Sequence, residues 1–183
     1  MARLTATLLW LDAITVAALL VFWQWDIDAT LLALLAHVLW QGPVCFLVAR
    51  VLARRRWLPG VGLFWLVAGL AAVGCMVASL GEWYGYLPLQ MWRIAFFAYM
   101  ALRTLAALPL LHPAAGDWRL RAAGGLICLG GWFFLATTPH WVQMWYANVF
   151  SLDYIGYWGL GVAALGQSLL ALVVWRPAPL PRA

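Results

Sequence analysis

The composition of the chain is that of a protein embedded in lipid. Its 183 residues are 67% hydrophobic and 9% charged, whereas soluble domains carry about 25% charged residues. The formal net charge is +5 and all 11 basic residues are arginine, which excludes Schiff-base chemistry on a lysine. The arginines lie between apolar stretches and not along one face, so they indicate membrane topology and not a nucleic-acid partner.

Six apolar stretches predict an all-α bundle of six transmembrane helices. A bilayer core of about 30 Å requires about 20 apolar residues per helix. The stretches cover residues 4–25, 29–53, 57–80, 91–111, 122–139 and 155–175, and the fifth is the shortest and is rich in glycine. The connections are short, so the sequence predicts one membrane domain over residues 1–183. Residues 176–183 form a short proline-rich cytoplasmic tail.

Charged residues fall into two alternating sets of connections. One set carries one acid, Asp117, and the arginines Arg3, Arg50, Arg54, Arg55, Arg56, Arg119, Arg121, Arg176 and Arg182. The other carries Asp26, Asp28, Glu82 and Asp153, with Arg93 as the one base near them. Because arginine near the end of a span is retained on the cytoplasmic side, this sorting predicts a multi-pass protein of the bacterial inner (plasma) membrane with both termini cytoplasmic.

Two charged residues lie deep inside the apolar stretches, well away from their ends. Asp12 lies about 12 Å from the cytoplasmic edge of the first stretch, at 1.5 Å per residue. Arg103 lies at about the same depth in the fourth stretch. A charge inside a membrane span is costly and marks a paired or functional group, so equal depth predicts an intramembrane Asp12–Arg103 ion pair. The pair could be a structural clamp or part of a proton or cation relay.

His37 and Gln41 form a second candidate site. They lie one helical turn apart on the same face of the second stretch, just before Pro43. A proline here predicts a kink that frees a backbone carbonyl, which favours a binding site, although a kink without a ligand is an open alternative. Neither His112 nor His140 matches the depth of His37, which argues against haem b. We predict no cofactor and no metal site.

Aromatic residues gather at the expected periplasmic edge. Of the 14 tryptophans, those at this edge are Trp23, Trp25, Trp83, Trp92, Trp141, Trp145 and Trp158. An interfacial belt explains part of this distribution, and asymmetric anchoring is the alternative without a cavity. Residues 140–150 could lie flat as an interfacial helix that roofs a cavity. Glu82, Trp83, Arg93 and Trp145 are therefore candidate binding residues for a cationic or aromatic small molecule.

The chain lacks the motifs G-x-S-x-G, H-E-x-x-H and G-x-x-x-x-G-K, so we assign no catalytic residue. We expect a membrane protein that binds or translocates a small molecule, for instance as the membrane subunit of a transporter. Two alternatives stay open. One is an accessory or assembly subunit of an envelope or respiratory complex, and the other is an intramembrane enzyme that acts on a lipid or quinone.

Small residues at four-residue spacing allow close helix contact with protein partners or within the chain. These pairs are Ala13 and Ala17, Ala68 and Ala72, Gly74 and Ala78, and Gly159 and Ala163. The chain resembles the substrate-binding subunits of vitamin uptake systems in size and expected layout, and its tryptophan content is similar to that of the tryptophan-rich sensory proteins. Neither resemblance assigns a functional residue.

Overall fold

The computed structural model describes residues 2–22, 27–53, 61–86, 91–113, 117–146 and 154–175. Within these ranges all regular structure is helical, as the sequence predicts. The elements are α1 (Ala2–Phe22), α2 (Ile27–Ala53), α3 (Val61–Trp83), α4 (Met91–Ala107), the 3-10 helix η1 (Leu108–Leu111), α5 (Trp118–Tyr146) and α6 (Tyr154–Trp175). Each predicted apolar stretch overlaps one of these helices, and the fourth stretch overlaps α4 and η1 together.

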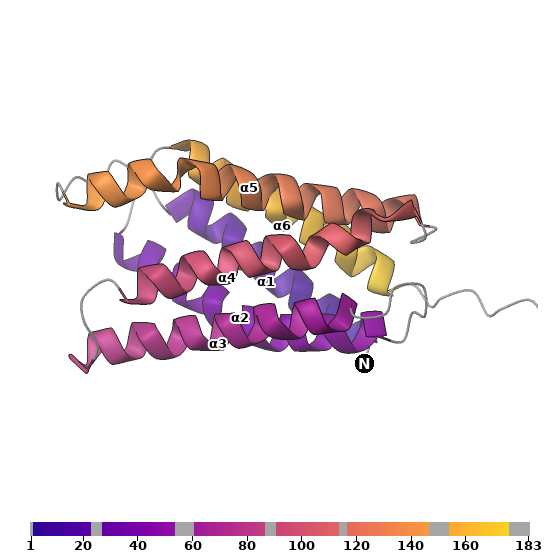
Figure 1. The fold of residues 1–183 in the computed structure, drawn as a ribbon, viewed down its shortest axis with the longest axis horizontal. Helices are drawn as coiled ribbons and strands as arrows, with labels where there is room; N and C mark the ends of the chain where they lie inside the picture. The colour runs from indigo at the N-terminus through magenta and orange to yellow at the C-terminus, as the bar shows by residue number, and fades with distance from the viewer. Residues whose placement is uncertain are drawn as a thin grey trace, which may run out of the picture.

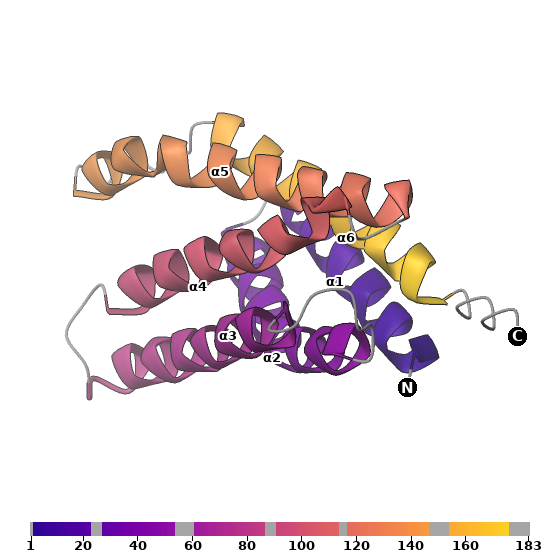
Figure 2. The same ribbon diagram turned by 45° about the vertical axis from the view of Figure 1, so that its right-hand side comes forward.

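The helices form a closed ring. Each α-helix packs on the next one along the chain, and α6 also packs on α1; Figures 1 and 2 show this arrangement. The Arg3 guanidinium carbon lies 6.0 Å from the centroid of the Trp175 ring. The beginning of α1 and the end of α6 therefore lie beside each other, at the same end of the bundle.

The outer surface of the ring is apolar. The stretches Val61–Ala78, Ile94–Leu111, Trp118–Thr137 and Trp158–Trp175 are long and apolar enough to cross a membrane. Large exposed apolar side chains on them include Leu63, Phe64, Leu70, Val77, Ile94, Leu129, Trp132, Leu165 and Leu172. An apolar surface of this extent indicates a membrane-embedded protein. The crossing of the membrane by α1 and α2 stays a prediction.

The fifth helix corrects a sequence prediction. The sequence predicts a short span over 122–139, whereas α5 covers Trp118–Tyr146 and has 29 residues. It begins early because Asp117 caps it: the Oδ1 atom of Asp117 accepts a hydrogen bond from the backbone N–H of Arg119 at 2.9 Å. At the other end the backbone stays helical through Tyr146, so the segment expected to form a separate interfacial helix begins as a continuation of α5.

The last turn of the fourth span is tighter than an α-helix. The α-helical part of α4 ends at Ala107, and η1 follows over Leu108–Leu111. Pro109 has no backbone N–H to donate, and its ring disfavours the α conformation at Leu108. The predicted span 91–111 is therefore present as two consecutive helical segments.

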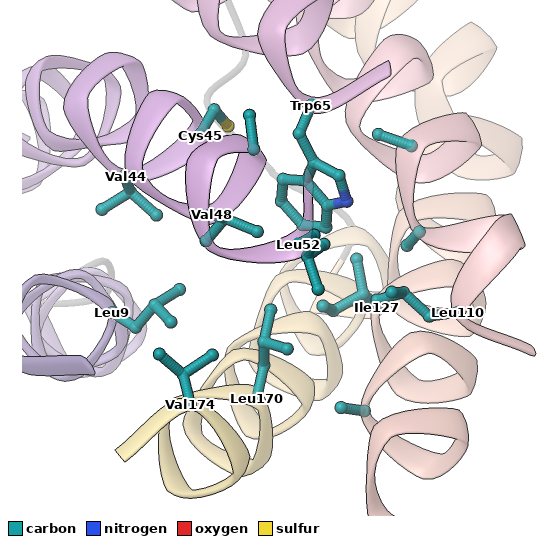
Figure 3. Close-up of a cluster of buried hydrophobic side chains, with 14 of the residues drawn as sticks. Leu9, Val44, Cys45, Val48, Leu52, Trp65, Leu110, Ile127, Leu170 and Val174 are labelled. Atoms are coloured by element: carbon teal, nitrogen blue, oxygen red, sulfur yellow. The ribbon is translucent and has the colours of Figure 1, made fainter. Parts of the chain in front are cut away.

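Two apolar clusters occupy the interior at different heights. The arginine-end cluster lies toward the helix ends that bear arginine and includes Leu9, Val44, Val48, Leu52, Trp65, Leu110, Ile127, Leu170 and Val174; Figure 3 shows these side chains. The aromatic cluster lies toward the opposite end and includes Val16, Phe96, Tyr99, Met100, Phe134 and Leu160. The Phe96 and Phe134 rings meet edge to face, with centroids 5.7 Å apart, which is a favourable aromatic geometry.

The helices α5 and α6 approach until their backbones touch. A Cβ atom added at Gly159 would lie 2.7 Å from the carbonyl oxygen of Gly130, and one added at Gly130 would collide with the backbone of Gly159 and Ala163. The small-residue face of Gly159 and Ala163 thus serves packing within the chain. Gly74 differs, because an added Cβ would meet nothing within 4 Å.

Candidate intramembrane polar site

Buried polar side chains gather in the interior of the ring. Asp12 on α1 and Gln41 on α2 are 0% exposed, His37 on α2 is 1% exposed, and Arg103 on α4 is 2% exposed. Tyr99, also on α4, is fully buried. We call Asp12, His37, Gln41, Tyr99 and Arg103 the polar cluster. Tyr99 belongs to both groups, because its ring is part of the aromatic cluster and its hydroxyl is polar. Polar residues inside a membrane protein bundle mark binding sites, proton pathways or structural pairs.

The polar cluster lies between the two apolar clusters. On α1, Asp12 stands one turn after Leu9 of the arginine-end cluster and one turn before Val16 of the aromatic cluster. On α4, Arg103 follows Tyr99 of the aromatic cluster by one turn and precedes the arginine-end residues of that helix. Apolar side chains therefore separate the polar cluster from both ends of the bundle.

The Asp12 carboxylate is held by two side chains of α2. The Nδ1 atom of His37 lies 2.8 Å from Oδ1 of Asp12, and the Nε2 atom of Gln41 donates to Oδ2. An ionised carboxylate only accepts hydrogen bonds, so with Asp12 ionised the Nδ1 atom of His37 carries the hydrogen. Nε2 is then the ring nitrogen that Asp12 does not engage.

The structure relates Arg103 to Asp12 differently from the sequence prediction. Arg103 lies near enough to interact electrostatically with Asp12, Cys45 and Tyr99. Among the described residues no direct ion pair joins Asp12 to Arg103, and the Asp12 carboxylate is hydrogen-bonded to His37 instead. Both carboxylate oxygens are already engaged by α2, which explains why the guanidinium acts on Asp12 through space.

Several atoms of the polar cluster lack a hydrogen-bond partner within the described part of the chain. They are Nε2 of His37, the hydroxyl of Tyr99, and Nε and Nη2 of Arg103. Buried polar groups are almost always paired, and an unpaired one costs about 1–3 kcal/mol. These side chains thus have hydrogen-bonding capacity that the described residues do not use.

Aromatic rings cover one side of the polar cluster. The His37 and Tyr99 rings meet edge to face with centroids 6.4 Å apart. The Tyr99 ring lies 6.0 Å from that of Phe96, measured between centroids. Cys45 lies on the α2 side, where its Sγ atom is 3.9 Å from Oε1 of Gln41. A group bound here would thus meet polar atoms beside an apolar wall.

The proline in α2 does not interrupt the helix. The backbone is helical through Pro43, whose side chain is exposed, while Gly42 is buried. A Cβ at Gly42 would lie 3.2 Å from Cγ2 of Val73 on α3. Gly42 therefore allows the close approach of α2 and α3, and Pro43 leaves the carbonyl of Leu39 without its usual helical donor.

The remaining candidate residues are positioned less completely. Glu82 and Trp83 belong to α3, Arg93 to α4 and Trp145 to α5, but their side chains lie outside the described part of the chain. The aromatic rim and its ligand preference therefore stay predictions. His112 is exposed beside η1, and it does not belong to the polar cluster.

Sequence reasoning missed Tyr99 as a member of the site. A signal was present, because Tyr99 precedes Arg103 by four residues and so shares its helix face. It also missed Gln167, which is fully buried on α6 and whose two side-chain polar atoms are unpaired among the described residues. Within the same part of the chain, no three His, Cys, Asp or Glu side chains gather closely enough to hold a metal ion.

These features define a class: a helical membrane-embedded protein with an occluded, charged polar cluster between two apolar layers. No family model matches the chain, and comparisons with curated proteins and with solved structures find no match.

Proposed function

We propose that this protein binds a small molecule at the polar cluster and translocates it across the membrane, alone or as the membrane subunit of a transporter. One observation carries the proposal: unpaired polar atoms of His37, Tyr99 and Arg103 lie buried together in the described interior. A purely structural clamp would be expected to satisfy its own hydrogen bonds. Unused bonding capacity is instead typical of a binding site whose ligand supplies the missing partners.

The two apolar clusters supply the barriers that such a transporter needs. Apolar side chains separate the polar cluster from both ends of the bundle, so a bound molecule would be shielded from water on both sides. Release to one side requires rearrangement of one apolar cluster while the other stays closed. This is the general logic of alternating access around a site near the membrane midplane.

Native mass spectrometry tests the proposal. The protein is purified in mild detergent from the membrane in which it is made, and the mass of any retained small molecule is measured. The wild type should retain an adduct that Arg103→Gln loses. The matched control is Arg121→Gln, which changes an exposed arginine and should retain the adduct. Equal adducts in all three proteins, or no adduct in any, would contradict the proposal.

We infer six crossings of a bacterial inner membrane, with both termini in the cytoplasm. The contact between Arg3 and Trp175 supports an even number of crossings. Arg119 and Arg121 at the start of α5 belong to the same end as the start of α1, as Figure 1 shows for these helices, and this grouping fits the retention of arginine on the cytoplasmic side.

A second candidate function is acid–base catalysis on a lipid or quinone within the bilayer. The observation in its favour is the Asp12–His37 pair, in which a carboxylate orients an imidazole. The opposite nitrogen of this imidazole is unpaired in the described structure. The same arrangement serves general bases in enzymes. Conversion of the retained molecule by the wild type, and its intact recovery from His37→Gln, would favour this function over transport.

A further inference from the structure

We propose that the ligand of the polar cluster is a carboxylate, bound together with one proton that His37 carries. The inference rests on the proposed function, since it names the class of molecule and the ion that accompanies it. The sequence predicts a cationic or aromatic ligand for the aromatic rim. The carboxylate proposed here binds at a different place, the polar cluster.

The unpaired atoms of Arg103 indicate the shape of the ligand. The guanidinium is planar, and the N–H bonds of Nε and of Nη2 point from the same edge. Both atoms are buried and without a hydrogen-bond partner in the described part of the chain. This edge is the one that holds two oxygens of a carboxylate through a pair of parallel hydrogen bonds. A cationic ligand would meet only donors and a like charge there.

The other unpaired atoms complete a set of donors. The Tyr99 hydroxyl can donate one hydrogen bond, and the Nε2 atom of His37 donates when the imidazole is protonated. His37 and Tyr99 are adjacent, as their ring contact shows, and Arg103 acts electrostatically on Tyr99. The proposal places one acceptor group where it can take hydrogen bonds from these three side chains. The aromatic cluster beside them suits an apolar body attached to that group.

Charge balance indicates that a proton accompanies the carboxylate. With His37 neutral, the negative charge of Asp12 offsets the positive charge of Arg103. A bound carboxylate then adds one uncompensated negative charge in a medium of low dielectric constant, which is strongly unfavourable. Protonation of His37, at the ring nitrogen that Asp12 does not engage, restores neutrality. Each bound carboxylate should therefore take up one proton.

The groups around His37 on each neighbouring element are consistent with this balance. Asp12 comes from α1, Gln41 and Cys45 from α2 itself, and Tyr99 and Arg103 from α4. On α3 the nearby titratable group is Cys75, which interacts electrostatically with Tyr99. Asp12 and Arg103 are the charged members of this set, so His37 is the group that adjusts when a further charge enters.

Three ring compounds of equal size test the charge of the ligand. Thermal unfolding of the detergent-purified wild type is measured with benzoate, benzamide and benzylamine. Benzoate should raise the Tm, and the other two should leave it unchanged. The Tm of Arg103→Gln should not respond to benzoate, whereas that of Arg121→Gln should respond as the wild type does. Laurate in mixed micelles, compared with benzoate in solution, distinguishes a membrane-borne carboxylate from a free one.

Calorimetry counts the accompanying proton. Benzoate is titrated into the wild type at pH 7.5 in two buffers with different heats of ionisation, and the difference in apparent enthalpy gives the protons taken up. We expect about one proton per benzoate. Because binding takes up a proton, the affinity should fall as the pH rises, by at most about tenfold per pH unit. In His37→Gln the proton count should fall to zero and the affinity should no longer depend on pH.

The outcomes separate this inference from the proposed function. Stabilisation by benzamide or benzylamine equal to that by benzoate would overturn the carboxylate assignment and leave a binding site in place. Benzoate binding without proton uptake would overturn the role of His37 alone. If none of the three compounds shifts the Tm and native mass spectrometry shows no retained molecule, both proposals fail.

Discussion

At the scale of single residues, Asp12 shows how a buried charge is accommodated. Two hydrogen bonds from α2, from His37 and Gln41, engage both of its oxygens. Arg103 adds an opposite charge nearby without direct contact. The hydrogen bonds fix the orientation of the carboxylate, and Arg103 offsets its charge. The hydrogen bonds to Asp12 thus come from α2, whereas the opposite charge comes from α4.

Double-mutant cycles measure how strongly Asp12 is coupled to His37 and to Arg103. We expect the combination of Asp12→Asn with His37→Gln to show a coupling energy of about 1–3 kcal/mol in stability, because each change removes the same hydrogen bond. Asp12→Asn combined with Arg103→Gln should couple more weakly, since no direct bond joins them. Unfolding in detergent provides the free energies. Additive losses for Asp12 and His37 would show that the hydrogen bond contributes nothing.

A substitution of Tyr99 distinguishes a functional role of its hydroxyl from a structural one. Replacing it with phenylalanine removes a buried hydroxyl that has no partner among the described residues, so the stability of the unliganded protein should stay the same or rise by up to about 1 kcal/mol. Ligand retention should nevertheless fall. Tyr86→Phe is the control, because Tyr86 is 83% exposed. A destabilised Tyr99→Phe protein would assign the hydroxyl a structural bond instead.

At the scale of elements, the closest helix contact depends on the absence of side chains. Gly130 and Gly159 let the backbones of α5 and α6 touch, and this close contact replaces the hydrophobic driving force that is missing inside a lipid bilayer. The Asp117 cap lengthens α5 at one end, and Pro109 tightens the end of α4 beside it.

Two glycine variants test the contact between α5 and α6. Gly130→Ala should destabilise the protein by several kcal/mol or prevent its folding, because the new Cβ would collide with the α6 backbone. Gly74→Ala should be neutral or slightly stabilising, because alanine favours helix by about 1 kcal/mol over glycine and the site is open. The Tm values in one detergent provide the comparison. Equal Tm values would mean that α5 and α6 can separate without cost.

At the scale of the whole molecule, the ring places both ends of the described chain together. Each helix packs on the next one along the chain, and the packing of α1 on α6 closes the ring. The Arg3–Trp175 contact lies at this closing pair. The interior that results holds a charged cluster between two apolar layers, and the outer surface is apolar. This distribution of polarity is the reverse of that in a soluble bundle and suits a lipid environment.

Reporter fusions test the topology. A reporter that is active only in the cytoplasm should be active when fused to either end of the chain. Fusions within residues 54–60 should also be active, whereas fusions within 87–90 should be silent. Reporters at the two ends that indicate opposite sides of the membrane would contradict the closed ring as a membrane arrangement. The arginine distribution would then have another cause.

Much of the fold could be predicted because membrane spans leave a direct record in hydropathy. The proximity of Asp12 and Arg103 could also be predicted, because the two residues lie equally far from the ends of their apolar stretches. The hydrogen-bond partners of Asp12 could not be predicted. The sequence does not show toward which neighbouring helix a side chain of α1 points, and those neighbours are known only once the order of the helices in the ring is known. The length of α5 was underestimated because Asp117 and the aromatic residues after 139 do not resemble a span.

The bonding of Asp12 to α2 has a consequence for the order of membrane insertion. During synthesis α1 emerges first, and an unaccompanied aspartate would oppose its entry into lipid. Since both hydrogen-bond partners lie on the very next helix, the two segments can enter as a hairpin with the carboxylate already satisfied. Arg103 arrives two helices later and α6 last of all. A nascent chain that stops after α2 should therefore already be stably inserted, while one that stops within the connection after α1 should slip back.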